Sequence, residues 1–258
     1  MGFAPTRVLI VTSRLDVGGT EGHLVRVLPA LQRRGINLTL YVMERGGPLE
    51  AELLANGIKI EGPHRMRPLH WPRASLKLAR FLRRERPTVV HFFLPRPYIY
   101  GSIAAELAGH RLRLMSRRSL SHYRSRYPLL GSIERTLHRR TSGLIANSRA
   151  VFDQLEGEVG DRRKLTLIHN GVHLPAQQSA SSRVPTRRRL GIADDALVMI
   201  VVANLIPYKG HADLIEALAR AKDNLPGPWT VLTVGRDDGN GAELKRKALA
   251  LKLADNFL

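Results

Sequence analysis

The sequence contains no cysteine, which excludes disulfide bonds, thiolate metal sites and cysteine nucleophiles. Aromatic residues are also scarce, at 5% of the 258 residues, and no nucleic-acid recognition motif accompanies them. This composition argues against the stacking platforms that bind single-stranded nucleic acid, so we expect no specific nucleic-acid partner. Since nothing points to secretion, we expect a cytoplasmic protein.

Long hydrophobic runs are missing as well. The longest apolar runs, residues 8–11 and 198–203, are far shorter than the roughly 20 residues that a membrane-spanning helix needs. Their length and composition are typical of strands that are buried on both faces of a sheet. The sequence therefore predicts strands here and no membrane anchor.

Acidic residues are few relative to basic ones, because 22 Asp and Glu oppose 41 Lys and Arg for a formal net charge of +19. Such a field attracts an anionic membrane surface, a phosphorylated substrate or nucleic acid, and it is also typical of an ordinary solvated surface rich in arginine. Two basic segments with apolar faces, residues 74–84 and 124–140, either contact the inner face of a membrane peripherally or pack against the sheet.

What the sequence does contain is a regular alternation of strand and helix patterns, which predicts an α/β fold with parallel, doubly wound sheets. The predicted domains are residues 1–172, complete, and 196–258, partial. Residues 173–195 are predicted to be a linker, because they are rich in Gln, Ser, Pro and Arg without a hydrophobic period. The predicted strands are 7–13, 38–43, 58–60, 88–92, 113–116, 144–146, 165–168, 197–204 and 230–235, and the predicted helices are 20–34, 74–84, 98–108, 129–137, 148–155, 211–221 and 242–253.

The loop after the first strand is the first candidate for a binding site, since ligands of parallel sheets bind at the carboxyl ends of the strands. Gly18 and Gly19 let the backbone approach a ligand closely, and the helix behind them offers free amides to a phosphate. We predict that Thr20 is the N-cap of this helix and that Gly35 ends it. A glycine pair at this position is also typical of a tight turn without a ligand.

Two later loops of the first domain carry polar side chains at strand ends. His91 is a candidate for binding a sugar hydroxyl or moving a proton, or it is a structural histidine. Arg117 and Arg118 end another strand, where guanidinium groups meet phosphate or carboxylate unless they are ordinary surface arginines. His91 and Arg117 are therefore the candidates for catalysis.

The second domain has two candidate loops of its own. Asn204, Lys209 and Gly210 follow a strand and open a helix whose N-terminus favours anions, and Lys209 adds a mobile cation, which suits a diphosphate. Gly235 begins a second close-approach turn. The two aspartates that follow it are more typical of a turn than of a divalent-metal site, so no metal is expected.

Taken in chain order, these segments resemble the large retaining glycosyltransferase family of the B-type fold, the family 4 type, whose members have two Rossmann-like domains. The resemblance is carried by residues 18–21, 146–148, 168–172, 202–211 and 235–239. It implies transfer of a sugar from a nucleotide sugar to an acceptor with retained anomeric configuration, without a required metal or other cofactor.

The resemblance also implies roles for individual residues. The donor lies in a cleft between the domains, mainly against the second, while the first takes the acceptor, a glycan or lipid-linked molecule of envelope or exopolysaccharide synthesis. Asn170 and Gly171 match the hinge. The donor-binding residues are Gly18, Gly19, Asn204, Lys209, Gly210 and Gly235.

The sequence departs from the family pattern at three places. Asn204 stands where many members have an arginine beside the donor diphosphate, which leaves Lys209 as the matching cation. Residues 116–118 stand where many members place a histidine, and the family's paired glutamates have no counterpart before Leu258. We therefore expect a weak or inactive transferase or, as the alternative, a non-catalytic acceptor-binding protein that needs a partner.

Overall fold

The computed structural model describes residues 6–64, 71–120, 128–172 and 183–257. The chain divides into two compact units, Met1–Val172 and His173–Leu258. None of the helices within the described ranges is long and apolar enough to cross a bilayer.

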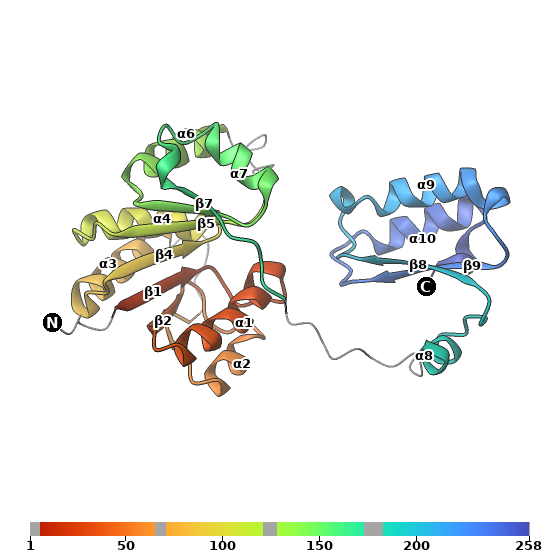
Figure 1. The fold of residues 1–258 in the computed structure, drawn as a ribbon, viewed down its shortest axis with the longest axis horizontal. Helices are drawn as coiled ribbons and strands as arrows, with labels where there is room; N and C mark the ends of the chain where they lie inside the picture. The colour runs from red at the N-terminus through yellow and green to blue at the C-terminus, as the bar shows by residue number, and fades with distance from the viewer. Residues whose placement is uncertain (1–5, 65–70, 121–127, 173–182, 258) are drawn as a thin grey trace. The chain divides into compact units, whose positions relative to one another are not determined.

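The first unit is built on a parallel sheet. Its strands are β1 (Arg7–Thr12), β2 (Asn37–Val42), β3 (Lys59–Glu61), β4 (Val89–Phe93), β5 (Arg113–Arg117), β6 (Gly143–Ala146) and β7 (Leu165–Leu167). They form a seven-stranded sheet in the order β3-β2-β1-β4-β5-β6-β7, and every neighbouring pair is parallel (Figure 1). The predicted α/β class with a parallel sheet is confirmed.

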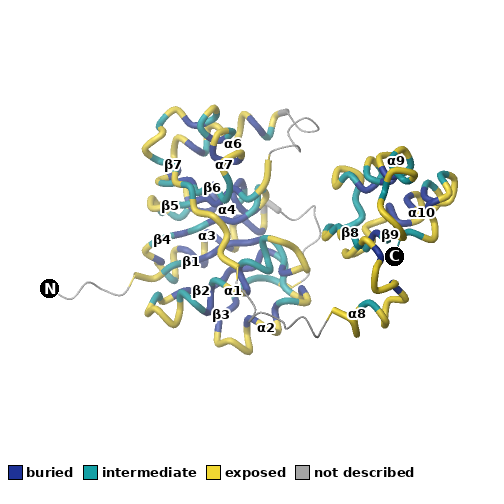
Figure 2. Tube along the Cα trace, turned by 45° about the vertical axis from the view of Figure 1, so that its right-hand side comes forward, coloured by how far each residue is buried: buried dark blue, intermediate teal, exposed yellow. Residues whose placement is uncertain are grey.

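Helices cover both faces of this sheet. They are α1 (Gly19–Arg33), α2 (Glu50–Ala55), α3 (Trp71–Glu85), α4 (Pro95–Leu107), α6 (Pro128–Arg140) and α7 (Arg149–Glu156). Because successive side chains of a strand point to opposite faces, Ile10 of β1 packs with α1 and α2, whereas Leu9 and Val11 pack in the cluster with α3, α4 and α7. Both layers bury the central strands, as Figure 2 shows.

The N-cap of the first helix lies two residues before the predicted one. Gly18 is the N-cap of α1, without a side-chain cap hydrogen bond, so the prediction of Thr20 as N-cap is wrong. A Cβ at Gly18 would lie 2.4 Å from Oε2 of Glu21, which means that the Glu21 carboxylate folds back over the start of the helix. Gly35, with φ of +82°, follows the helix and ends it as predicted.

Two short helices are absent from the sequence-based prediction. Helix α2 has six residues, too few to show a clear apolar period. Helix α8 (Arg183–Arg189) lies inside the predicted linker, with Pro185 in its first turn, where proline is tolerated. The predicted linker thus contains a short helix, and residues 173–182 lie outside the described residues.

The second unit has two parallel strands, β8 (Leu197–Val202) and β9 (Trp229–Val234), with helices α9 (His211–Ala221) and α10 (Gly241–Ala250). The helices pack on one face around Val231 and Leu244. On the other face Ile200, Val202 and Val234 are 60%, 74% and 49% exposed. One apolar sheet face is thus uncovered in the described part of this unit, which also contains the 3₁₀ helices η4 (Pro207–Lys209), η5 (Lys222–Asn224) and η6 (Ala254–Asn256).

Candidate functional site

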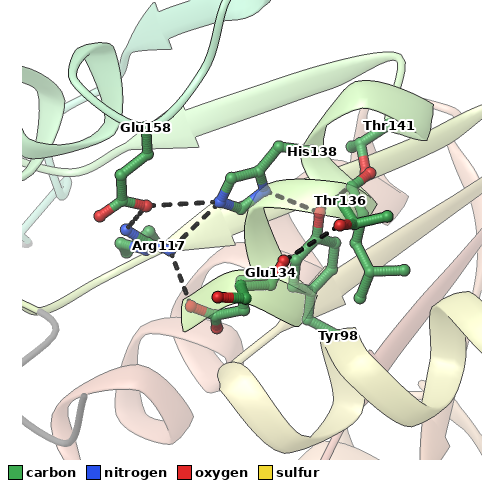
Figure 3. Close-up of polar contacts among 9 residues, drawn as sticks. Tyr98, Arg117, Glu134, Thr136, His138, Thr141 and Glu158 are labelled. Atoms are coloured by element: carbon green, nitrogen blue, oxygen red, sulfur yellow. Dashed lines mark hydrogen bonds and ion pairs between the residues drawn. The ribbon is translucent and has the colours of Figure 1, made fainter. Parts of the chain in front are cut away.

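Strand alternation separates the two arginines at the end of β5. Arg117 has the same parity as Met115, which packs in the cluster with α4 and α7, and its side chain is only 6% exposed. Its guanidinium donates to Glu158 Oε2 at 2.6 Å and to Glu134 Oε2 at 3.3 Å, as Figure 3 shows. Two carboxylates thus compensate the charge of Arg117, which anchors β5 to α6 and to the segment after α7.

The buried ion pairs continue into a chain of neutral polar groups (Figure 3). Nε2 of His138 lies 3.4 Å from Glu158 Oε2, and its Nδ1 lies 2.8 Å from the hydroxyl of Tyr98, which also meets Thr141 Oγ1 at 2.9 Å. Burial lowers the pKa of His138, with Glu158 opposing the shift, and burial raises the pKa of Tyr98. The polar groups of this network form hydrogen bonds and ion pairs with one another, as expected of a structural core.

Arg118 lies on the other side of the sheet edge. Its guanidinium donates to Oδ1 of Asn170 at 2.6 Å and stands 5.9 Å from the centre of the Phe93 ring, and Asn147 Nδ2 donates to its carbonyl at 3.2 Å. Burial lowers the pKa of Arg118, and the nearby Glu21 charge opposes the shift. The edge of the sheet therefore presents Arg118 rather than Arg117, and it joins Arg118 to the predicted hinge residue Asn170.

His91 lies at the same edge, on β4. Its Nε2 is 2.8 Å from Oγ of Ser116, and its ring is 4.5 Å from that of Phe93. Burial lowers the pKa of His91 to about 3, and the charge of Arg118 adds to the shift. His91 is therefore neutral near neutral pH, which suits hydrogen bonding to a hydroxyl rather than donation of a proton as imidazolium.

The start of α1 completes this edge. Burial lowers the pKa of His23 to about 4, and both Arg118 and Arg26 add to that shift, so the three side chains lie within electrostatic reach of one another. Burial raises the pKa of Glu21. Gly18 and Gly19, which the sequence predicts to bind a ligand, lie at this helix start. A Cβ at Gly19 would meet nothing within 4 Å, so there is room for a ligand beside the first turn of α1.

In the second unit, two of the predicted donor residues hold the loops together. Asn204 Nδ2 donates to Oδ2 of Asp238 at 3.1 Å, and its Oδ1 accepts from the amide of Arg236 at 3.3 Å. A Cβ at Gly235 would lie 2.1 Å from the carbonyl oxygen of Ala203. The close approach that requires glycine at 235 is therefore between the loops after β8 and β9.

Asp237 and Asp238 have the turn role that the sequence predicts. Oδ1 of Asp237 accepts from the amides of residues 239, 240 and 241 at 2.9, 3.0 and 2.9 Å, and these hydrogen bonds lower the pKa of Asp237. Asp238 pairs with Arg236 at 2.6 Å, which lowers its pKa. Asp237 thus stabilises the start of α10, as a capping carboxylate does.

Lys209 and Gly210 lie at the start of α9. Gly210 is the N-cap in the left-handed region, with φ of +77° and no side-chain cap hydrogen bond. Lys209 is exposed, and its Nζ lies 5.2 Å from the centre of the Tyr208 ring. An uncapped helix N-terminus beside a mobile ammonium group can bind a diphosphate.

Two family profiles cover nearly the whole chain. The profile described as Glycosyltransferase Family 4 matches residues 17–175, and the one described as Glycosyl transferases group 1 matches residues 183–258. The chain belongs to glycosyltransferase family 4.

Relatives of this family 4 chain include two with curated names. The D-inositol 3-phosphate glycosyltransferase of Actinosynnema mirum is 28% identical over 93% of the chain, and the lipopolysaccharide core biosynthesis glycosyltransferase LpsE of Rhizobium meliloti is 26% identical over 82% of it. The chain spans 64% of the length of the first relative and 55% of the second.

Solved structures establish the fold of this family 4 chain. Anabaena HepE in complex with UDP and glucose superposes with a TM-score of 0.83 at 20% identity, over 98% of this chain and 68% of HepE. WaaG, a glycosyltransferase involved in lipopolysaccharide biosynthesis, superposes with a TM-score of 0.72 at 16% identity, over 97% of this chain and 69% of WaaG. The predicted B-type glycosyltransferase fold is confirmed.

Proposed function

We propose that this family 4 chain serves to transfer a sugar from a nucleotide sugar to a glycan or lipid-linked acceptor in envelope or exopolysaccharide synthesis, with retained configuration and without a metal. The observation that carries the proposal is the start of α9, where Lys209 adjoins an uncapped helix N-terminus. The HepE structures with UDP and with UDP-glucose, and the name of LpsE, support a nucleotide-sugar donor and a polysaccharide product.

The chemistry at α9 is stabilisation of the leaving nucleoside diphosphate. Negative charge grows on the diphosphate as the bond to the sugar breaks, and fixed amide dipoles with a nearby cation stabilise that charge without reorganisation. Asn204 contributes by holding the two loops of the second unit in register through Asp238, so its role in donor binding is indirect.

Donor binding tests this proposal. We expect calorimetric titration with UDP to show saturable binding that Lys209→Ala weakens by about tenfold, the loss of roughly 1.4 kcal/mol. Lys222→Ala, at the opposite end of α9, is the matched control and should bind as the wild type does. Added EDTA should leave the affinity unchanged. Equal affinities in Lys209→Ala and the wild type would contradict the proposal.

An acceptor-binding protein that needs a partner is a second candidate, and the uncovered face of β8 and β9 favours it. Ile200 and Val202 are more than half exposed there, as on a surface that a second protein covers. Under this alternative the chain copurifies with a different protein, and Val202→Gln releases it. A monodisperse monomer that binds UDP supports the transferase instead.

We also place the protein in the cytoplasm with peripheral contact to the anionic inner membrane face, through α6. Leu129 and Ile133 are 81% and 43% exposed on this helix, beside the exposed Arg135 and Arg139. On α3, in contrast, Leu78, Phe81 and Leu82 are packed in the core, and Leu76 is 47% exposed. Leu129→Gln should reduce co-sedimentation with vesicles that contain phosphatidylglycerol, and binding that ignores the anionic lipid content would refute the contact.

A further inference from the structure

We propose that Arg236 is a second cation of the donor site and binds the diphosphate of the nucleotide sugar together with Lys209. This inference rests on the proposed function, in which the diphosphate binds at the start of α9, and deepens it by naming a further binding residue. Asn204 and Asp238 are then positioning residues, which act on the diphosphate through Arg236. Strand pairing, the hydrogen bonds around Arg236 and the charges of the two loops each support this role.

Arg236 lies at the carboxyl end of β9, directly beside Asn204 at the end of β8. The two strands are parallel, with Val202 opposite Val234. The pairing continues beyond the strands, because the amide of Leu205 donates to the carbonyl of Arg236 at 2.9 Å. Neighbouring strands are about 5 Å apart, a distance that a long guanidinium side chain spans. Since ligands of parallel sheets bind at the carboxyl ends of the strands, Arg236 extends from the ligand-binding edge of this unit.

Lys209 belongs to the neighbouring loop at the same edge. In that loop the amide of Ile206 donates to the carbonyl of Asn204 at 2.9 Å, and the amide of Lys209 donates to the carbonyl of Ile206 at 3.0 Å. These hydrogen bonds make two tight turns, so the loop stays folded near the end of β8. The loops after β8 and β9 also approach each other closely at Gly235. Lys209 and Arg236 therefore come from two loops that are packed together at one end of the sheet.

The guanidinium of Arg236 is held in place by two side chains. Its Nε and Nη2 donate to the two carboxylate oxygens of Asp238 at 2.6 and 3.2 Å. Asn204 completes the arrangement, because its Nδ2 donates to Asp238 at 3.1 Å and its Oδ1 accepts from the amide of Arg236 at 3.3 Å. The side chain of Arg236 is nonetheless 56% exposed. A fixed but accessible guanidinium loses little side-chain entropy when it binds a phosphate oxygen.

The charges of the two loops also favour a role for Arg236. Asp237 and Asp238 lie in the loop next to that of Lys209, and uncompensated carboxylates there would repel a diphosphate. The carboxylate of Asp237 accepts three amides at the start of α10, and that of Asp238 is paired with Arg236. A guanidinium has five N–H donors and can bind two anions at once, as Arg117 does with two carboxylates. Arg236 can therefore compensate Asp238 and bind a phosphate oxygen at the same time.

The test separates direct binding of the diphosphate by Arg236 from compensation of Asp238 alone. It uses the full chain in calorimetric titrations with UDP. We expect Arg236→Gln to weaken UDP binding by about tenfold, and Arg236→Lys, which keeps the charge but not the fork of donors, to weaken it less. The double variant Arg236→Gln/Asp238→Asn loses both charges and should remain weaker than the wild type by about fivefold or more.

Arg220→Gln is the matched control, because Arg220 is an exposed arginine in the last turn of α9, at the end opposite Lys209. This variant should bind UDP as the wild type does. Circular dichroism checks that each variant is folded. Hydrogen exchange of the β8 and β9 amides without UDP checks that the two loops keep their structure, and it should be unchanged in Arg236→Gln.

Two results would overturn the role of Arg236. In the first, Arg236→Gln binds UDP as tightly as the wild type while Lys209→Ala binds it more weakly, so the proposed function stands and the role of Arg236 fails. In the second, the double variant regains the wild-type affinity, which would mean that Arg236 only compensates Asp238. If the wild-type chain does not bind UDP at all, the proposed function itself fails, and the role of Arg236 fails with it.

Discussion

At the scale of single residues, Arg117 and Arg118 illustrate how one step along a chain reverses an environment. Successive side chains of a strand point to opposite faces, so Arg117 is buried between two carboxylates while Arg118 lies at the ligand-binding edge. The sequence alone places both at a strand end and favours Arg117 as the catalytic candidate. Choosing between them requires the register of β5 and the facing carboxylates on distant segments, which local sequence does not specify.

The buried ion pairs of Arg117 predict a large loss of stability on substitution. Arg117→Leu leaves Glu134 and Glu158 buried without their counter-charge, which should lower the free energy of unfolding by about 3–5 kcal/mol. Urea denaturation, together with hydrogen exchange of the β5 amides, measures the free energy of unfolding. The control is Arg111→Leu at an exposed position, which should change this free energy by less than about 0.5 kcal/mol. A loss below about 1 kcal/mol for Arg117→Leu would show that the pairs stabilise little.

The two histidines at the sheet edge predict a dependence of stability on pH. Because the folded-state pKa values of His91 and His23 lie at about 3 and about 4, below the ordinary value of 6.5, the unfolded chain binds protons first as pH falls. Stability should therefore be complete above about pH 6.5 and decline below it, by about 1 kcal/mol per pH unit for each histidine.

Hydrogen exchange of the β4 and β5 amides between about pH 7.5 and pH 5.5 measures this decline, in a range where carboxylates stay ionised. His91→Gln keeps a hydrogen bond to Ser116 and should reduce the slope. An identical slope in His91→Gln would mean that His91 titrates normally in the folded protein.

At the scale of elements, buried strands and long helices follow from the sequence, since continuous apolar runs and helical periods are local signals. Helices α2 and α8 do not, because six or seven residues carry too little periodicity. The glycine loops are predicted in part, because the sequence marks the glycine but not its contact. The sequence marks Gly235 as a close-approach residue, but the partner is the carbonyl of Ala203 on the neighbouring loop, a tertiary contact.

That contact predicts a specific sensitivity of the second unit. Gly235→Ala brings a Cβ to 2.1 Å from Ala203 O, so the loops after β8 and β9 must separate, at a cost of about 1–3 kcal/mol. Hydrogen exchange of the β8 and β9 amides measures the loss. Gly160→Ala, where a Cβ meets nothing within 4 Å, is the control, and protection in Gly235→Ala equal to that control would contradict the contact.

At the scale of the whole molecule, the order of motifs along the chain predicts the family and the fold. It predicts only part of the candidate site. Lys209 and Gly210 lie at a helix N-terminus as the sequence indicates, because a glycine that opens a helix after a strand is a local pattern. The cationic edge with Arg118 depends on three elements meeting, and the net charge of +19 points to an anionic ligand without locating it.

The most direct test of the central claim, that the start of α9 binds the donor diphosphate, is hydrogen exchange of the wild-type chain with and without UDP-glucose. We predict that UDP-glucose slows exchange at residues 204–214 and 235–241 of the second unit, and that Lys209→Ala abolishes this protection at the same ligand concentration. Protection confined to the first unit, or protection that persists in Lys209→Ala, would contradict the account.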